Sequence, residues 1–394
     1  MRGHSCRARG TAFGCALVAL SALTSGLLHA STYHVSPSGS DANPGTLAQP
    51  FATWQKGHDV AMPGDLIYLH GGVYKLKGES SVGVRMRGRN GEPGRPIRFW
   101  AYPGQTPVLD CSALRNDRGV TGVSFSADWW HFRGFAVTGV AQPTETSYST
   151  GFRAANCDNC IFEQLEIHHN TAPGFYLSGD ASDNLVLNCD FHHNCDALTK
   201  DYQGGNADGI AVGFCTGRGN VVRGCRSWWN SDDGYDLWAT EQPVTIEDCW
   251  AFWNGFKPNT REKAGDGNGF KLGRNANGPR HIIRRNLAFS NRANGFDENG
   301  ASGPLEITGN TGYANGARNF QFSSAVAHRL RDNLSVRAGE RLGPNVEQSR
   351  NSWQLAIKVR DESFVSLSDA GVDGPRRPGG GLPRLDFLRL RPGR

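Results

Sequence analysis

Residues 220–238 read NVVRGCRSWWNSDDGYDLW, and this stretch contains the unit that the middle of the chain repeats. A short run of strand-forming residues ends at Asn230, and a glycine followed by an apolar residue comes four positions later, at Gly234. The asparagine recurs as Asn170, Asn194, Asn230, Asn254, Asn291 and Asn315, and the glycine recurs as Gly174, Gly209, Gly234, Gly269 and Gly295. A supersecondary unit that returns at a regular spacing predicts a solenoid.

The spacing of the repeat selects the kind of solenoid. Each glycine is followed by the next asparagine after 20 to 22 residues, and each asparagine by the next glycine after 4 or 15 residues, in alternation. One unit is therefore about 24 residues long, with eleven-residue insertions at the same corner before Gly209 and Gly269. Leucine-rich repeats share this period but need a leucine lattice, which is absent. The short β-branched and aromatic runs predict an all-β fold, a right-handed parallel β-helix with one unit per coil.

Two positions of the unit face the interior. The residue after each glycine is apolar and predicts a buried column of Phe175, Ile210, Tyr235, Phe270 and Phe296. A second column, five residues before each asparagine, contains Leu165, Cys189, Cys225, Cys249, Asn286 and Asn310. The repeated asparagines predict a hydrogen-bonded ladder inside a turn, because each amide is both a donor and an acceptor.

The first thirty residues differ from the rest of the chain. Arg2, Arg7 and Arg9 precede an apolar run over 11–28, and Leu28-His29-Ala30 offers a small-residue cleavage site. This pattern is typical of a secretory signal, and the run is short for a membrane anchor. We expect a secreted, extracellular protein, with the periplasm as an alternative, in which residues 31–394 form one catalytic domain.

Both ends of this domain differ from the repeat. Residues 31–75 predict an N-terminal cap with a short capping helix within 51–61, ended by Pro63. Residues from about 339 to 394 predict C-terminal strands and a tail packed on the β-helix, and we expect a monomer.

Charge and cysteine content limit the partners. The net charge of +5 falls to +2 without the three signal arginines, and no phosphate loop or basic array indicates nucleic acid. After the signal, the sequence has no run of eighteen apolar residues, so we expect no contact with a membrane once the signal is cleaved. Eight cysteines remain after the signal, either as disulfides, with Cys157/Cys160 and Cys189/Cys195 closest in sequence, or as buried thiols.

Aligned coils bring distant charges together. Adjacent strands lie about 4.8 Å apart, so equivalent residues of successive coils become neighbours. The position before the glycine holds Asp208 and then Asp233, and the position two after it holds Asp236 and then Lys271. With Asp232, four carboxylates gather beside one lysine, which predicts a bound cation, and hard oxygen ligands favour calcium. The alternative is that NADG and NSDDGYD are only turns, and the acids reach the outer face only if the chain bends at each glycine.

In these motifs the chain resembles polysaccharide lyase family 9, the pectate lyase group built on a right-handed parallel β-helix. The resemblance covers roughly 33–388 and rests on SPSGSDANPGT, QPFATW, NADG, NSDDGYDLW and GNGFKLG in that order. It implies that Lys271 is the catalytic base and that calcium is bound by Asp208, Asp232, Asp233 and Asp236. Arg274 stands where the family pattern leads us to expect glycine, which points to an altered subsite.

The resemblance implies a calcium-dependent pectate lyase that cleaves polygalacturonate, the pectin backbone, by β-elimination to 4,5-unsaturated oligogalacturonides. The insertions are expected to wall the substrate groove, where Arg274, Lys257 and Arg261, with Lys200 and Lys263, are candidates to bind uronates. Homogalacturonan, its methylated form and rhamnogalacturonan remain alternatives as the polymer.

Two other functions fit the same fold. A polygalacturonase-like glycoside hydrolase would use the carboxylates and give Lys271 no role, but the expected GHG motif is absent. A non-catalytic glycan-binding β-helix would use aromatic side chains as a stacking face, namely Trp228, Trp229, Trp250, Trp253, His168, His169, His192 and His193.

Overall fold

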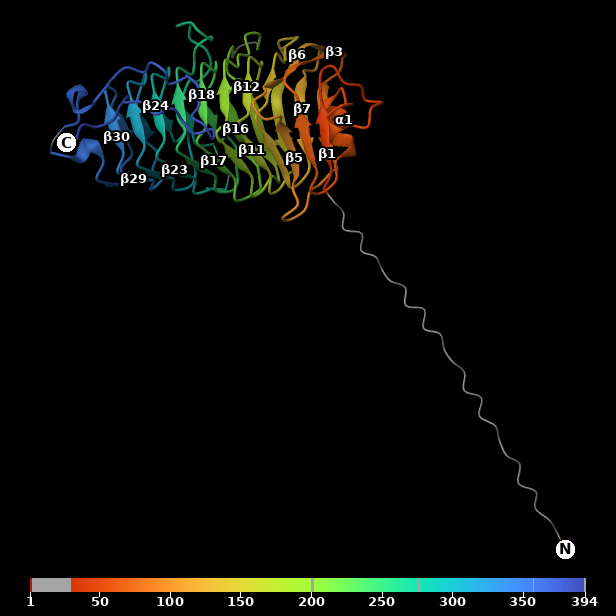
Figure 1. Cartoon of the computed structure of the whole chain (residues 1–394). Helices are drawn as coiled ribbons and strands as arrows, with labels where there is room; N and C mark the ends of the chain where they lie inside the picture. The colour runs from red at the N-terminus through yellow and green to blue at the C-terminus, as the bar shows by residue number, and fades with distance from the viewer. Residues whose placement is uncertain (2–29, 200–201, 275–276, 357, 393–394) are drawn as a thin grey trace.

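The computed structural model describes residue 1 and residues 30–199, 202–274, 277–356 and 358–392. The chain winds into stacked coils of parallel strands along one axis (Figure 1), which confirms the predicted parallel β-helix. Residues 2–29 of the predicted signal lie outside the described residues. Within the described parts, no helix has the length and apolar character needed to cross a membrane.

Three parallel sheets form the walls of the coils in the described residues. The first sheet contains β1 (Thr32–Val35), β2 (Leu66–Leu69), β5 (Ile97–Ala101), β8 (Trp130–Arg133), β11 (Ile161–Glu163), β14 (Leu185–Leu187), β17 (Val221–Arg223), β20 (Thr245–Glu247), β23 (Ile282–Arg284), β26 (Glu306–Thr308), β29 (Arg329–Arg331) and β32 (Glu347–Ser349). The second contains β3 (Gly72–Glu79), β6 (Pro107–Arg115), β9 (Ala136–Thr138), β12 (Glu166–His168), β15 (Asp190–His192), β18 (Arg226–Trp228), β21 (Trp250–Phe252), β24 (Leu287–Phe289), β27 (Thr311–Tyr313) and β30 (Leu334–Val336). The third contains β4 (Val82–Arg87), β7 (Thr121–Ser126), β10 (Thr150–Ala155), β13 (Phe175–Gly179), β16 (Ile210–Cys215), β19 (Tyr235–Asp236), β22 (Phe270–Lys271), β25 (Phe296–Asp297), β28 (Phe320–Phe322) and β31 (Glu340–Leu342).

The apolar column of the repeat lies inside the third sheet, as predicted. Its members pair in register from coil to coil and are at most 1% exposed. The rings of Tyr235 and Phe270 stack with centroids 4.5 Å apart, and those of Phe270 and Phe296 with centroids 4.8 Å apart. Burial of these aromatic side chains is a main source of stability for the coils.

The predicted asparagine ladder is confirmed. The Nδ2 of each asparagine donates to the Oδ1 of the next, for example from Asn230 to Asn254 at 3.0 Å and from Asn254 to Asn291 at 3.0 Å. Backbone N–H groups of the same asparagines donate to the same oxygens. The ladder therefore satisfies buried polar groups that the turn would otherwise leave unpaired.

The repeated glycines accommodate this ladder. The chain bends at each of them, as the orientation of the acids required. A Cβ on Gly234 would lie 2.9 Å from Asn254 Nδ2 and 2.6 Å from Gly269 O. Glycine is needed here because the neighbouring coil approaches too closely for a side chain, not because of a left-handed backbone.

Asn254→Ala is expected to lower the free energy of unfolding by about 3 kcal/mol, because it leaves buried donors and acceptors of its neighbours without partners. Its side chain bonds Asn230, Asn291 and the Ser227 carbonyl. Denaturant unfolding measures the loss, and the exposed Asn345→Ala serves as the matched control. Equal stability of the two variants would show that the ladder contributes little.

The structure shows whether the cysteines form disulfides or remain thiols. All eight cysteines in the described residues are free, and all but Cys195 are buried. The Sγ atoms of Cys189, Cys225 and Cys249 accept backbone N–H groups of the preceding coil at 3.3–3.4 Å. These cysteines act as small hydrogen-bond acceptors in the same role as the asparagines that continue their column.

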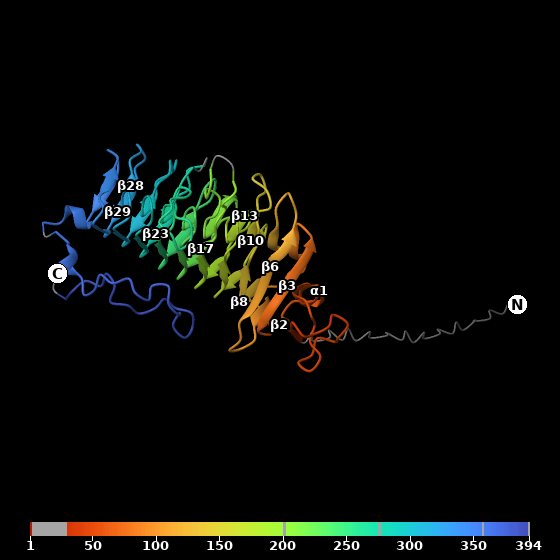
Figure 2. The same cartoon turned by 90° about the horizontal axis from the view of Figure 1, so that it is seen from above.

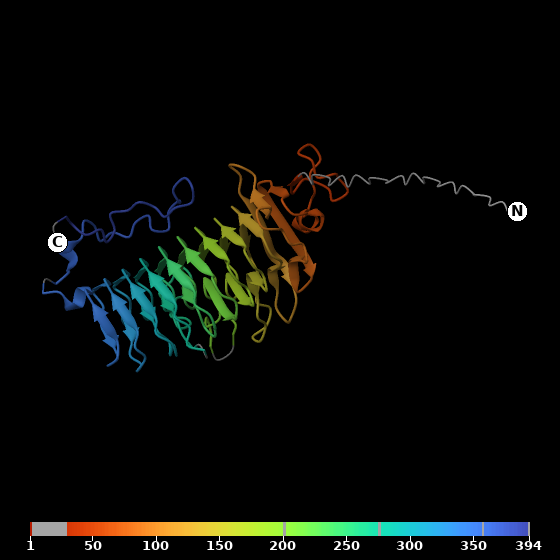
Figure 3. The same cartoon turned by 90° about the horizontal axis from the view of Figure 1, so that it is seen from below.

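Different segments close the two ends of the coil stack. The single α-helix of the described residues, α1 (Trp54–Val60), begins after the N-cap Thr53 and lies at the N-terminal end (Figure 2). At the other end the 3-10 turn Ser352–Gln354 follows the last strand, and the C-terminal segment 358–392, which contains a second 3-10 turn at Asp361–Ser363, runs back alongside the coils (Figures 2 and 3).

The C-terminal segment covers aromatic residues of the second sheet. Phe387 packs edge to face on Phe289, with ring centroids 4.8 Å apart, within a buried cluster that includes Trp228. Arg376 binds Asp190 through two nitrogens at 2.7 and 3.0 Å. Trp228 is therefore only 5% exposed, which removes it from the stacking face considered for a glycan-binding protein.

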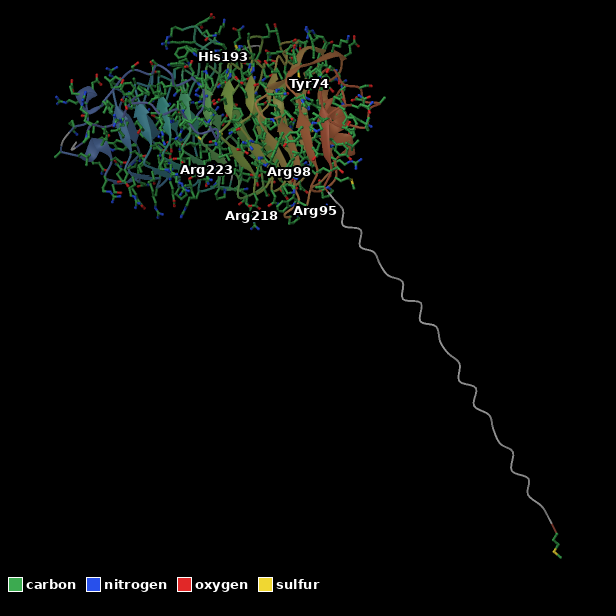
Figure 4. The ribbon with its side chains drawn as sticks, in the orientation of Figure 1. Tyr74, Arg95, Arg98, His193, Arg218 and Arg223 are labelled. Atoms are coloured by element: carbon green, nitrogen blue, oxygen red, sulfur yellow. The ribbon has the colours of Figure 1, made fainter. Side chains whose placement is uncertain are left out.

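The first sheet, by contrast, carries charged side chains on its outer side. Figure 4 shows Arg98 and Arg223 along the edge of the molecule opposite to His193, which follows the second-sheet strand β15. Arg223 forms an ion pair with Glu247 of the next coil.

Candidate active site

The predicted alignment of Asp236 with Lys271 exists on the outside of the third sheet. Arg153, Tyr176, Ala211, Asp236 and Lys271 pair in register on five successive strands, β10, β13, β16, β19 and β22. Lys271 therefore lies one coil beyond Asp236, as the aligned repeat required.

Lys271 is surrounded by carboxylates. Its Nζ lies 3.1 Å from Asp233 Oδ2, 3.3 Å from Asp236 Oδ2 and 3.0 Å from Asp266 Oδ2. The lysine side chain is 12% exposed. The structure thus brings the lysine and the acids together, on the outer side of the coils rather than in the apolar interior.

Asp233 is the centre of the acidic group. It is fully buried, and its Oδ1 accepts from the backbone N–H of Asn268 at 2.6 Å and from Asn268 Nδ2 at 3.0 Å. The backbone N–H of Asp233 donates to Asp208 Oδ1 at 3.2 Å. On the other side, Asp232 Oδ1 accepts from the backbone N–H of Asp266 at 2.6 Å. These hydrogen bonds fix the carboxylates on neighbouring coils.

The acids outnumber the positive charge beside them. Burial raises the pKa of Asp208, Asp232, Asp233 and Asp236, to about 7 for Asp233, and the acids' mutual repulsion adds to the rise. Burial opposes the charge on Lys271, but the surrounding carboxylates outweigh it and raise the pKa of the amine. One ammonium is shared by several acids, so a further cation would stabilise the group.

The donor set fits a hard divalent cation. One oxygen from each of Asp208, Asp233 and Asp236 lies within 4.8 Å of the others, and so does one from each of Asp232, Asp233 and Asp266. Among the described residues, the buried Asp233 Oδ2 accepts no hydrogen bond. An all-oxygen set in which this buried oxygen has only the Lys271 ammonium beside it suits the ligand preference of calcium.

The acidic group lies in a cleft of about 800 Å³ on the third sheet. Asp208, Asp232, Asp236, Lys271 and Arg274 contribute to its lining. Tyr202, Gly205 and Asn206 come from the first insertion and Asp266 from the second, so both insertions wall the groove as expected.

The predicted substrate-binding cations do not share one location. Arg274 is exposed in the cleft, while Lys257 and Arg261 are not among its described lining residues. Lys257 forms an ion pair with Glu262, and the Arg261 guanidinium lies 5.6 Å from the ring centroid of Phe256. Lys263, also a candidate, is absent from the described lining, and Lys200 lies outside the described residues.

The cleft also holds residues that the sequence analysis missed. Arg153 follows Gly151-Phe152, so extending the glycine pattern one coil further back would have found it. Asp266 accepts a hydrogen bond from Tyr202 and an ion pair from Lys271, which keep its pKa low although burial opposes this. Both Tyr202 and Asp266 lie in insertions, which have no period that would reveal their position.

Proteins of similar sequence include several named pectate lyase. Residues 33–335 match the family described as Pel9A-like, right handed beta helix region. Pectate lyase L of Dickeya chrysanthemi is 34% identical over 376 residues, which cover 93% of this chain and 85% of that protein.

Two solved structures share the whole architecture. A rhamnogalacturonan lyase superposes with a TM-score of 0.84 at 33% identity, covering 92% of this chain and 97% of that one. The crystal structure of pectate lyase Pel9A superposes with a TM-score of 0.82 at 32% identity, covering 94% of this chain and 92% of that one. The resemblance seen in the sequence motifs is thereby confirmed, and the chain belongs to the Pel9A-like right-handed β-helix family, the pectate lyase family of polysaccharide lyases.

Proposed function

We propose that this protein is a secreted, calcium-dependent lyase that cleaves the uronate-containing backbone of pectin by β-elimination. The observation that carries the proposal is the position of Lys271, whose Nζ lies 3.0–3.3 Å from three carboxylates in the cleft. The names of the similar proteins, pectate lyase and rhamnogalacturonan lyase, support a pectic substrate.

The reaction needs a base at one carbon of a uronate. Lys271 Nζ takes the proton from C5, which is acidified by the adjacent carboxylate, and the electrons of that C–H bond form the double bond between C4 and C5. The bond from C4 to the glycosidic oxygen breaks, and this oxygen leaves with the rest of the chain and takes a proton from water. The products are a 4,5-unsaturated sugar and a new chain end.

Lys271 accepts this proton only as a neutral amine. Without a metal, the surrounding carboxylates keep it charged. Calcium held by Asp208, Asp232, Asp233 and Asp236 would offset their charge and that of the substrate carboxylate, and stabilise the negative charge that develops at C5. With that charge offset, Asp266 is the carboxylate that still contacts the amine of Lys271, at 3.0 Å, and burial of Lys271 lowers its pKa.

The proposal predicts a chelator-sensitive rise in ultraviolet absorbance from the unsaturated product, with polygalacturonate and with rhamnogalacturonan as alternative substrates. Re-addition of calcium should restore the rate. New reducing ends without absorbance would indicate the hydrolase, and binding without cleavage would indicate the glycan-binding protein; either result contradicts the lyase.

A further inference from the structure

Exposed aromatic side chains are concentrated in the cleft. Among the described residues, the exposed Phe, Trp and Tyr side chains are Tyr148, Tyr202, Phe214 and Trp238, and all four line it. Phe214 is 56% exposed and Trp238 is 42% exposed. Aromatic rings left in water at a substrate groove indicate a binding surface, because aromatic residues are normally buried.

Phe214 is held outward by an irregular backbone. Its φ is +48°, and among the described residues it is the only non-glycine residue with positive φ inside a strand. The register between β13 and β16 shifts here, with the three residues from Leu177 to Gly179 opposite the four from Val212 to Cys215. Such a β-bulge re-aims a side chain, and a bulky residue with a left-handed backbone is strained. The strained backbone of Phe214 is therefore best explained by the position in the cleft that it gives to the Phe214 ring.

Trp238 holds a matching position one coil further on. Its backbone N–H donates to Asp236 Oδ1 at 2.8 Å, and its carbonyl accepts from the Phe214 N–H at 3.2 Å. The two rings meet edge to face, with centroids 5.0 Å apart and an interplanar angle of 77°. They form an apolar corner next to Asp236, the register neighbour of Lys271.

The distribution of charged residues in the cleft indicates which kind of sugar ring can bind at Phe214 and Trp238. Arg153 lies four strand steps from Lys271, about 19 Å along the stack, and Arg274 follows Lys271 by three residues in the same coil. Of the lining residues that the structure describes, those between Arg153 and Lys271 include no cation. A uronate carboxylate packed against these two rings would thus lose its hydration without a described basic partner on their own two coils, whereas an uncharged sugar ring would not.

We propose that Phe214 and Trp238 form a subsite for an uncharged pyranose of the pectic chain, between uronates that bind at Arg153 and at Lys271. The uncharged ring has two possible sources: a neutral sugar that alternates with galacturonate in the backbone, or a methyl-esterified galacturonate. The inference rests on the proposed function only in taking a pectic chain as the occupant of the cleft.

The test compares Phe214→Asn and Trp238→Ala with the parent on three polymers. Asparagine tolerates the left-handed backbone, so Phe214→Asn removes the ring without adding strain. The matched control is Leu47→Ala, which removes an apolar side chain that is 58% exposed outside the cleft. The polymers are rhamnogalacturonan backbone, partly methylated homogalacturonan and fully de-esterified polygalacturonate. The unsaturated product gives KM and kcat, and calorimetric titration in a Lys271→Ala background gives affinity without turnover.

We expect each subsite variant to raise KM about tenfold on one polymer that contains uncharged rings, with kcat unchanged and little effect on polygalacturonate. A loss confined to rhamnogalacturonan identifies the neutral sugar, and a loss confined to the methylated polymer identifies the ester. Phe214→Asn should also keep or raise the melting temperature. Unchanged affinity for all three polymers, or an equal loss on polygalacturonate, overturns the subsite. If no polymer yields unsaturated product but the affinity losses appear as expected, the proposed lyase activity fails and the subsite stands.

Discussion

Replacement of Lys271 by alanine should lower kcat by about a thousandfold or more while the protein still binds substrate. The alanine cannot accept the proton from C5, and loss of a positioned base typically costs two to four orders of magnitude. The lysine is also the ammonium shared by Asp233, Asp236 and Asp266, so the variant is measured in excess calcium with its fold checked by circular dichroism. Initial rates come from the absorbance of the unsaturated product.

Two further variants separate the base from the charge. Lys271→Arg keeps a cation among the carboxylates but has no accessible neutral form, so it should be nearly as inactive as the alanine variant. Lys75→Ala removes an exposed lysine of β3 that is not among the described lining residues of the cleft and should leave kcat unchanged. Turnover by Lys271→Ala close to that of the parent would exclude Lys271 as the base.

Asp233→Asn should lower kcat/KM by about a hundredfold at a fixed, limiting calcium concentration. Asp233 belongs to both groups of acids that can hold a cation, and it contacts Lys271 directly. Asparagine keeps an acceptor for the two donors of Asn268, so the local backbone should be retained. The calcium concentration that gives half-maximal activity should rise correspondingly.

The same variant should show a pH-dependent gain in stability without metal. The folded-state pKa of Asp233 is about 7, above the ordinary 3.8, so between these values the folded chain holds a proton that the unfolded chain has released. Its contribution to the free energy of unfolding therefore falls as pH rises through this window. In chelator, the melting temperature of Asp233→Asn relative to the parent should increase from about pH 4 to about pH 7. Added calcium should reverse the order at neutral pH.

The exposed Asp180→Asn is the matched control for this comparison. It removes one carboxylate without touching the cleft, and its melting temperature should follow that of the parent at every pH, with and without calcium. If Asp233→Asn responds to calcium as the parent does, the proposed metal position is incorrect.

The repeat in the sequence was sufficient to predict the coils, since their period, the apolar column and the asparagine ladder depend on local spacing alone. It also placed Lys271 one coil beyond Asp236, because parallel strands in register convert sequence distance into a fixed separation. Asp266 could not be placed in this way, because an insertion has no register with its neighbours. Phe214 was missed for another reason: strict alternation cannot show a β-bulge, which turns one side chain outward by adding a residue to one strand.

The C-terminal segment 358–392 has a consequence for aggregation of the protein during storage in solution. It shields the aromatic stripe of Trp228, Phe252 and Phe289, which runs across three successive strands of the second sheet. Proteolytic removal of this segment would expose a continuous apolar band along the second sheet, and such bands drive self-association. The shelf life of a preparation should thus depend on an intact tail even though the cleft is built by other parts of the chain.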